Sequence, residues 1–142
     1  MAIRWTKALA VGIADVDAQH QELFRRARAF ADGLAGRSRQ EVGLLLSYLR
    51  AYAVTHFDEE EEAMRAAGYP RLRKHKAEHD RFMRDLLKMS RQQEKRRGPG
   101  VAPAELARWM EEWLVEHLST TDGDMARFLL ASRAEAAPRA RR

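Results

Sequence analysis

The sequence predicts an all-α protein, an antiparallel up-down-up-down four-helix bundle with an extended N-terminal arm. Apolar residues recur at spacings of three and four in four long stretches, as in amphipathic helices. Glycine and proline gather at a few joints between these stretches. We expect one bundle domain over residues 1–131, including an arm over 1–14, and a flexible basic tail over 132–142.

The first segments are an arm and a helix. Alternating apolar residues such as Trp5 and Val11 predict the extended arm. The first helix is expected from about residue 17 to 34, with Gly36 as its C-terminal stop. Its inward face is predicted to comprise Val16, His20, Leu23, Ala27, Phe30 and Leu34.

The second helix is predicted between Ser38 and Gly68. Ser38 followed three residues later by Glu41 is a capping-box pattern, and Gly68 precedes a proline, as at a helix end. The inward face is predicted to comprise Val42, Leu45, Leu49, Tyr52, His56, Glu60 and Ala63.

The third and fourth helices are separated by a Gly-Pro-Gly break at residues 98–100. Pro70 is placed in the first turn of the third helix and Pro103 in that of the fourth. The two inward faces are predicted to comprise Leu72, His75, His79, Phe82, Leu86 and Met89, then Leu106, Met110, Trp113, Leu114, His117 and Thr121.

Composition narrows the class of protein. The chain has 142 residues, 45% of them hydrophobic, which suits one domain with a real core. It has no cysteine, so disulfides and thiolate metal sites are excluded. Neither a membrane-spanning apolar run nor a signal-peptide pattern is visible, and we expect a cytoplasmic protein.

The net charge of +5 raises nucleic acid as a partner. The excess arginines lie before the Gly-Pro-Gly break and at the C-terminus, with no aromatic residues among them to stack on bases. We therefore interpret them as solvated helix ends and tail, and expect no nucleic-acid partner.

All 5 histidines lie on or beside the apolar faces. His20 and His56 lie about 17 and 19 residues from the joint between their two helices. His56 and His79 lie about 12 and 11 residues from the second joint, and His79 and His117 about 20 and 18 from the third. Since each residue of a helix rises ~1.5 Å, the two members of each pair lie at nearly the same height along the bundle. In an antiparallel bundle one layer then contains His20, His56, Glu60, His75, His79, His117 and Asp122.

A polar layer in an apolar bundle predicts a metal centre. Unpaired, these groups would each cost several kcal/mol to bury, whereas imidazole and carboxylate are metal ligands. Seven ligands exceed the needs of one tetrahedral zinc and suit two octahedral first-row ions with bridging carboxylates. His117 and Asp122 are five residues apart, about 140° around an ideal helix. Either Asp122 reaches in from a flank or the helix widens locally.

The alternative for any single histidine is a hydrogen-bonded core residue, and a lone H-x3-H pair is common on helix surfaces. The joint pattern favours a metal, because no histidine is left over. Glu61 lies in an acidic run and is expected on the helix surface or beside a ligand, not as a ligand.

Four segments resemble the hemerythrin family, and its bacterial single-domain branch in particular: GIADVDAQH (12–20), HFDEEEEAM (56–64), YPRLRKHKAEH (69–79) and HLSTTD (117–122). The resemblance implies that three histidines hold one iron and two the other. The first iron would have His75, His79 and His117, the second His20 and His56. Glu60 and Asp122 would bridge the irons together with an oxo or hydroxo group.

The resemblance also implies that O2 binds reversibly at the iron with two histidines, taking one electron from each ferrous ion. Reversible binding needs an apolar, water-poor pocket, and the candidates for its wall are Leu23, Phe57, Phe82 and Leu114. One departure from the family is Met125, where a tyrosine is frequent; a lost hydroxyl could alter hydrogen bonding at the bridge.

The sequence thus predicts a monomeric, non-enzymatic O2-binding di-iron protein for oxygen storage, delivery or sensing, with an O2-consuming enzyme or a reductase as a further partner. The alternatives are a di-iron enzyme, a redox- or O2-sensing module that acts through a separate partner, and a metal-free bundle. The ligand set does not by itself exclude manganese or zinc.

Overall fold

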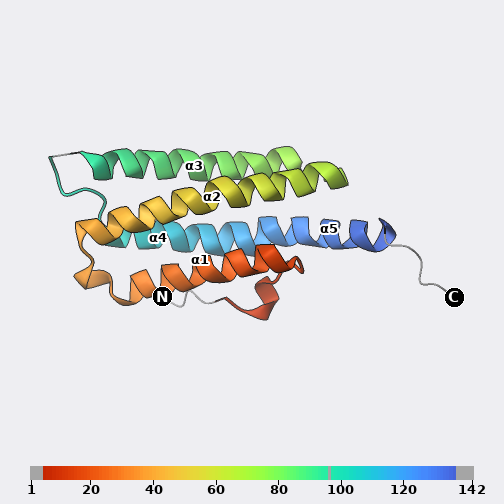
Figure 1. Ribbon diagram of the computed structural model, residues 1–142, viewed down its shortest axis with the longest axis horizontal. Helices are drawn as coiled ribbons and strands as arrows, with labels where there is room; N and C mark the ends of the chain where they lie inside the picture. Colours follow the sequence, from red (N-terminus) through yellow and green to blue (C-terminus); the bar gives the residue numbers. More distant parts are fainter. Residues whose placement is uncertain (1–4, 96, 137–142) are drawn as a thin grey trace.

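The four-helix bundle is confirmed by a computed structural model, which describes residues 5–95 and 97–136. In these ranges all regular structure is helical. The elements are η1 (Lys7–Leu9), α1 (Ala14–Asp32), η2 (Leu34–Gly36), α2 (Arg39–Ala67), α3 (Leu72–Glu94), α4 (Pro103–Trp113), η3 (Leu114–Asp122) and α5 (Gly123–Ala136). The last three follow one another directly and form the fourth long rod (Figure 1).

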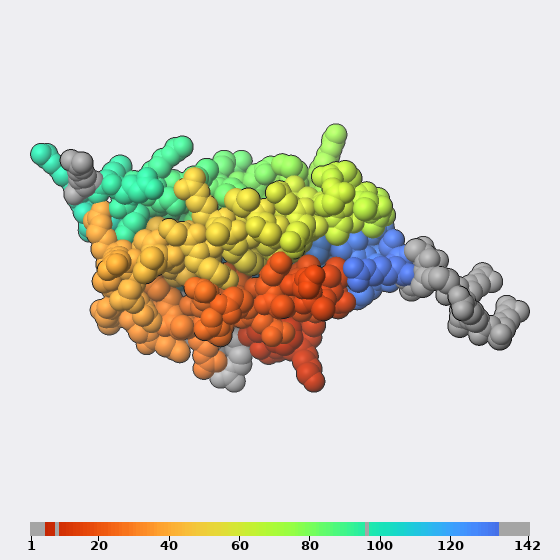
Figure 2. Space-filling view, viewed as in Figure 1, coloured from red at the N-terminus to blue at the C-terminus, as the bar shows by residue number. Residues whose placement is uncertain are grey.

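Neighbouring rods run antiparallel. The α1–α2 and α3–α4 connections lie at one end of the bundle and the α2–α3 connection at the other (Figure 1). The space-filling view shows the side chains of α1 and α2 in contact along the face that it presents (Figure 2). No helix in the described part of the chain is long and apolar enough to cross a membrane.

The predicted joints are largely those observed. Ser38 and Glu41 form the capping box at the start of α2, and Gly68 ends α2 with a φ of 70°, a left-handed conformation that favours glycine. Pro103 occupies the first turn of α4. Two details were wrong: α1 ends at Asp32, so Gly36 lies in the short helix η2, and Pro70 precedes α3 instead of lying in its first turn.

The N-terminal arm is less extended than predicted. Residues Lys7–Leu9 form a 3-10 turn, and the Asp17 carboxylate accepts the backbone N–H groups of Val11 at 2.7 Å and Gly12 at 3.1 Å. Gly12 lies beside the side chain of Leu130 and has a φ of 80°, a left-handed conformation that favours glycine. The arm therefore folds back against α5.

The C-terminal end is more helical than predicted. α5 continues to Ala136, so residues 132–136 of the predicted tail belong to a helix. The remaining tail residues, 137–142, and the first residues of the arm, 1–4, lie outside the described residues.

The apolar core is divided along the bundle axis. A large cluster fills the end near the α1–α2 connection and includes Phe57, Phe82 and Leu118. A smaller cluster near the α2–α3 connection includes Met64 and Met125. On α2, Glu60 stands between Phe57 of the large cluster and Met64 of the small one, and Asp122 stands in the same way between Leu118 and Met125. A polar layer therefore separates the two apolar regions.

Candidate metal centre

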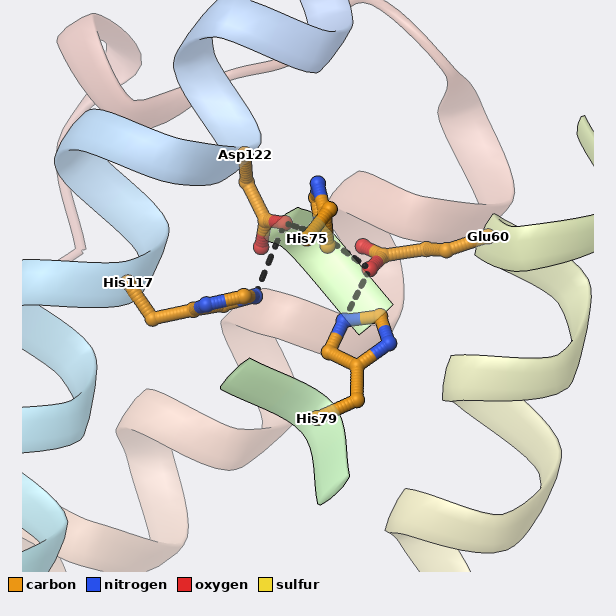
Figure 3. Close-up of side chains that lie close together, drawn as sticks. All are labelled: Glu60, His75, His79, His117 and Asp122. Atoms are coloured by element: carbon orange, nitrogen blue, oxygen red, sulfur yellow. Dashed lines mark ion pairs between the residues drawn. The ribbon is translucent and has the colours of Figure 1, made fainter. Parts of the chain in front are cut away.

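The structure brings the seven predicted ligands together in this layer. α1 contributes one of them, α2 and α3 two each, and η3 two, so every rod takes part. Figure 3 shows side chains of α2, α3 and η3 converging from different helices. All seven are buried: His20, His56, Glu60, His75, His79, His117 and Asp122.

The donor atoms form two overlapping groups, in each of which they lie within 4.8 Å of one another. The five-donor group comprises Glu60, His75, His79, His117 and Asp122, and the four-donor group comprises His20, His56, Glu60 and Asp122. Glu60 and Asp122 belong to both groups. A carboxylate has two oxygens, so each can serve two ions at once.

The helix widens where the sequence presented a geometric problem. Residues Leu114–Asp122 form a π-helix, whose hydrogen bonds run from residue i to i+5. Residues five apart, such as His117 and Asp122, then lie near the same face. Their Nε2 and Oδ1 atoms are 3.1 Å apart. Of the two possibilities raised by the spacing, local widening is the one observed.

Several buried polar atoms of the layer lack a hydrogen-bond partner, as expected for donor atoms of a metal site. The Nε2 atom of His75 lies 3.0 Å from an Asp122 oxygen, and that of His79 lies 3.1 Å from a Glu60 oxygen. Nevertheless, neither nitrogen and none of the four carboxylate oxygens makes a hydrogen bond within the described part of the chain. Such atoms are costly to bury, and metal coordination would satisfy them. The residues therefore fit a metal centre.

The electrostatics differ across the layer. Burial alone would lower the pKa of His75 and of His117, but the carboxylates beside them outweigh burial and raise each pKa to about 9. In His20 burial prevails and lowers the pKa. Burial opposes ionisation of Glu60, yet the surrounding histidines hold its pKa well below the usual range. The histidines likewise lower the pKa of Asp122, so both carboxylates favour the ionised form that binds cations, and a metal would compete with the protons of His75 and His117.

Three histidines have partners for the outer ring nitrogen. His79 Nδ1 lies 2.9 Å from Glu61 Oε2, and His117 Nδ1 lies 3.0 Å from Glu78 Oε1. His56 Nδ1 pairs with the amide oxygen of Gln19. An acceptor at Nδ1 fixes the proton there and leaves the Nε2 lone pair for a metal.

Sequence reasoning placed Glu61 on the helix surface or beside a ligand, and it lies beside one. It missed Glu78 and Gln19. Both stand next to a histidine in the chain, at 79 and 20, but each contacts a different histidine on another helix. Only the three-dimensional arrangement reveals these pairs.

Aromatic rings pack on the layer from the large core. Phe57 stacks on His79 with ring centroids 3.8 Å apart, and Trp113 stacks on His117 at 3.9 Å. The residues predicted to wall an O2 pocket share this one buried cluster: Leu23, Phe57, Phe82 and Leu114. Met125 is fully buried on the opposite side of the layer, with Met64, Tyr69 and Leu129.

Comparison with known proteins gives a consistent family. The Hemerythrin HHE cation binding domain matches residues 11–129. Bacteriohemerythrin of Methylococcus capsulatus is 31% identical over 119 residues, which cover 83% of this chain and 89% of that protein. Bacteriohemerythrin of Ralstonia nicotianae is 30% identical over 129 residues, covering 89% of this chain and 88% of that protein.

Solved structures agree with the sequence relatives. A crystal structure of wild-type hemerythrin superposes with a TM-score of 0.79 at 28% identity, covering 91% of this chain and 98% of that chain. The matched family spans the helices that supply every residue of the polar layer. The chain belongs to the hemerythrin family.

Proposed function

We propose that this protein holds two iron ions in the polar layer and binds O2 reversibly. The observation that carries the proposal is the pair of overlapping, buried donor groups with unequal numbers of ligands and two shared carboxylates. Membership of the hemerythrin family supports iron as the metal. An oxo or hydroxo bridge between the ions would complete the centre.

The unequal groups would give the two ions different roles. Three imidazoles and two carboxylate oxygens, with a bridging solvent oxygen, fill six positions at an octahedral ion. The His20 and His56 side supplies one imidazole fewer, which leaves one position for an external ligand. Bound iron would supply the electrons that O2 takes up and returns.

The protein's own residues would keep this exchange reversible. Leu23, Phe57, Phe82 and Leu114 would exclude water and proton donors from the open position, because all four are buried in one apolar cluster. Glu61 and Glu78 would hold the imidazoles of His79 and His117 in the orientation that presents Nε2.

The ligand set favours binding over turnover. Di-iron enzymes that activate O2 have carboxylate-rich centres, whereas this layer has five histidines and two carboxylates. The role that we propose is oxygen storage, delivery or sensing by a cytoplasmic monomer, with an O2-consuming enzyme or a reductase as partner.

Optical spectroscopy of the protein loaded anaerobically with ferrous iron tests the proposal. A colourless solution that gains a visible charge-transfer band under O2, and loses it under argon over repeated cycles, is the expected result. A band that decays once to the ferric spectrum, without return, would contradict reversible binding. Steady O2 consumption with NADH and a reductase would favour the enzyme instead.

A further inference from the structure

A groove on the surface leads to the polar layer from the α3 and α4 side. It has a volume of about 330 Å³. Its floor includes Trp109, Trp113 and His117, so one candidate metal ligand forms part of its lining.

Aromatic rings in contact connect the groove with the layer. Trp109 is half-buried, and its ring centroid lies 4.6 Å from that of Phe82. The ring centroids of Phe82 and Trp113 are 4.6 Å apart. Trp113 in turn stacks on His117, with ring centroids 3.9 Å apart and 11° between the ring planes. The rate of electron tunnelling falls exponentially with distance, so an unbroken series of ring contacts is a favourable path between the surface and a metal at His117.

The rim of the groove is acidic although the whole chain carries a net charge of +5. Its charged lining residues are Glu78, Arg81, Asp85, Glu112 and Glu116. Glu78 contacts His117, and Asp85 accepts the indole N–H of Trp109 at 3.2 Å. Glu112 and Glu116 are exposed and have no ion-pair partner among the described residues. Two exposed carboxylates beside a half-buried indole form a site that suits a cation.

Trp113 stands where the groove meets the buried core. It lines the groove and is only 8% exposed, so the series of ring contacts runs from the half-buried Trp109 to a buried ring beside the polar layer.

We propose that this groove receives a basic side chain of a one-electron donor protein, and that electrons enter the centre through Trp109, Phe82 and Trp113. The proposal rests on the proposed function, since it concerns the return of ferric protein to the ferrous, O2-binding form. Each donor molecule loses one electron and one ferric ion gains it, so two donor molecules restore one centre. No covalent bond forms or breaks.

Binding is tested without electron transfer. The full chain is loaded with zinc, which has no redox chemistry, and titrated calorimetrically with methyl viologen, a planar dication. We expect the double variant Glu112→Gln/Glu116→Gln to weaken binding about fivefold, and Trp109→Leu to weaken it by a similar factor. The variant Asp32→Asn/Glu62→Gln removes the same charge from exposed positions on α1 and α2 and should bind like the wild type.

Electron entry is tested by stopped-flow reduction of the ferric iron protein. The reductants are the viologen radical cation and the anionic radical of dithionite. The double variant Glu112→Gln/Glu116→Gln, the rim variant, should slow reduction by viologen about fivefold at low ionic strength. It should leave the rate of reduction by dithionite unchanged or raise it. High salt should remove this difference.

The outcomes are distinct. Equal viologen binding by the wild type and the rim variant would overturn the groove as a cation site. Rim-dependent binding with equal viologen reduction rates would overturn the electron route. Rim-dependent binding by the zinc-loaded chain, without reversible O2 uptake by the iron-loaded chain, would support the groove and contradict the proposed function.

Discussion

The two donor groups of the polar layer share two carboxylates but differ in what surrounds them. In the five-donor group, two of three histidines have a carboxylate at the outer nitrogen, Glu61 for His79 and Glu78 for His117. In the four-donor group, His56 has the neutral amide of Gln19, and His20 Nδ1 has no partner within the described residues. Charged support is thus concentrated on the side with more ligands.

This difference indicates a division of labour. An imidazole that donates to a carboxylate is a more basic ligand, and it stabilises the oxidised metal. The five-donor group would therefore hold an ion firmly through a change of charge. The four-donor group has fewer and more weakly supported donors, so on our proposal it would be the side on which an external ligand binds.

Removing a carboxylate that both donor groups share should empty both metal positions, so that the two groups no longer differ. For Glu60→Gln we expect loss of most bound iron from both groups, because the uncharged amide is a poor bridge. Iron per chain measured by plasma mass spectrometry gives the result. Glu62→Gln, an exposed neighbour on α2, is the control and should retain wild-type iron. Full occupancy in Glu60→Gln would contradict a bridging role.

Removing one histidine from each side should have unequal consequences. His56→Ala weakens only the four-donor group, so we expect about half the iron to remain and O2 binding to be lost. His79→Ala weakens the fully ligated group and should cost more iron and more thermal stability. Iron content and melting temperature of the two variants are compared. Greater stability of either alanine variant, with no metal bound to the wild type, would support the metal-free bundle.

Changing the outer partners should reproduce the same order with smaller effects. Glu78→Gln removes the carboxylate from His117 and is expected to lower metal affinity about 10–100-fold, as at other outer-shell carboxylates. Gln19→Ala removes a neutral partner from His56 and should lower the metal affinity by a smaller factor. Competition with a coloured chelator measures both affinities. The reverse order would show that charged support does not favour the five-donor group.

The apolar wall should affect the lifetime of the O2-bound form rather than metal binding. Leu23→Ala and Leu49→Ala both remove buried side chains from the large core, and each should cost about 2–5 kcal/mol of stability. Only Leu23 lies within one helical turn of a predicted ligand on the open side, His20. We therefore expect faster decay of the visible O2 band in Leu23→Ala alone. Equal decay in both would assign the effect to general destabilisation.

The sequence was sufficient for the bundle and for the residues of the polar layer, because helical periodicity and distance from the joints determine which side chains share a height. His20 and His56 meet for this reason, with Nε2 atoms 3.0 Å apart. The spacing of His117 and Asp122 left two solutions open. The structure has a π-helix in this segment, because its backbone hydrogen bonds join residues five apart, a pattern that residue identity alone does not specify.

Contacts between helices were the part that could not be predicted. Glu78 contacts His117 and Thr121 on another rod, and such pairs depend on rotation and tilt of each helix. The arm was predicted as extended from alternation alone, whereas Asp17 and the close approach of Gly12 to Leu130 fold it back. The cluster around Met125 shows that this buried position is filled by apolar packing with Met64.

Mössbauer spectroscopy of the protein loaded with the iron-57 isotope tests the asymmetry most directly. If O2 binds only on the side of His20 and His56, the oxygenated protein will show two quadrupole doublets of equal area, and argon will restore the original ferrous spectrum. A single doublet in the oxygenated protein, or a second doublet that argon does not remove, would contradict reversible O2 binding at one of two unequal irons.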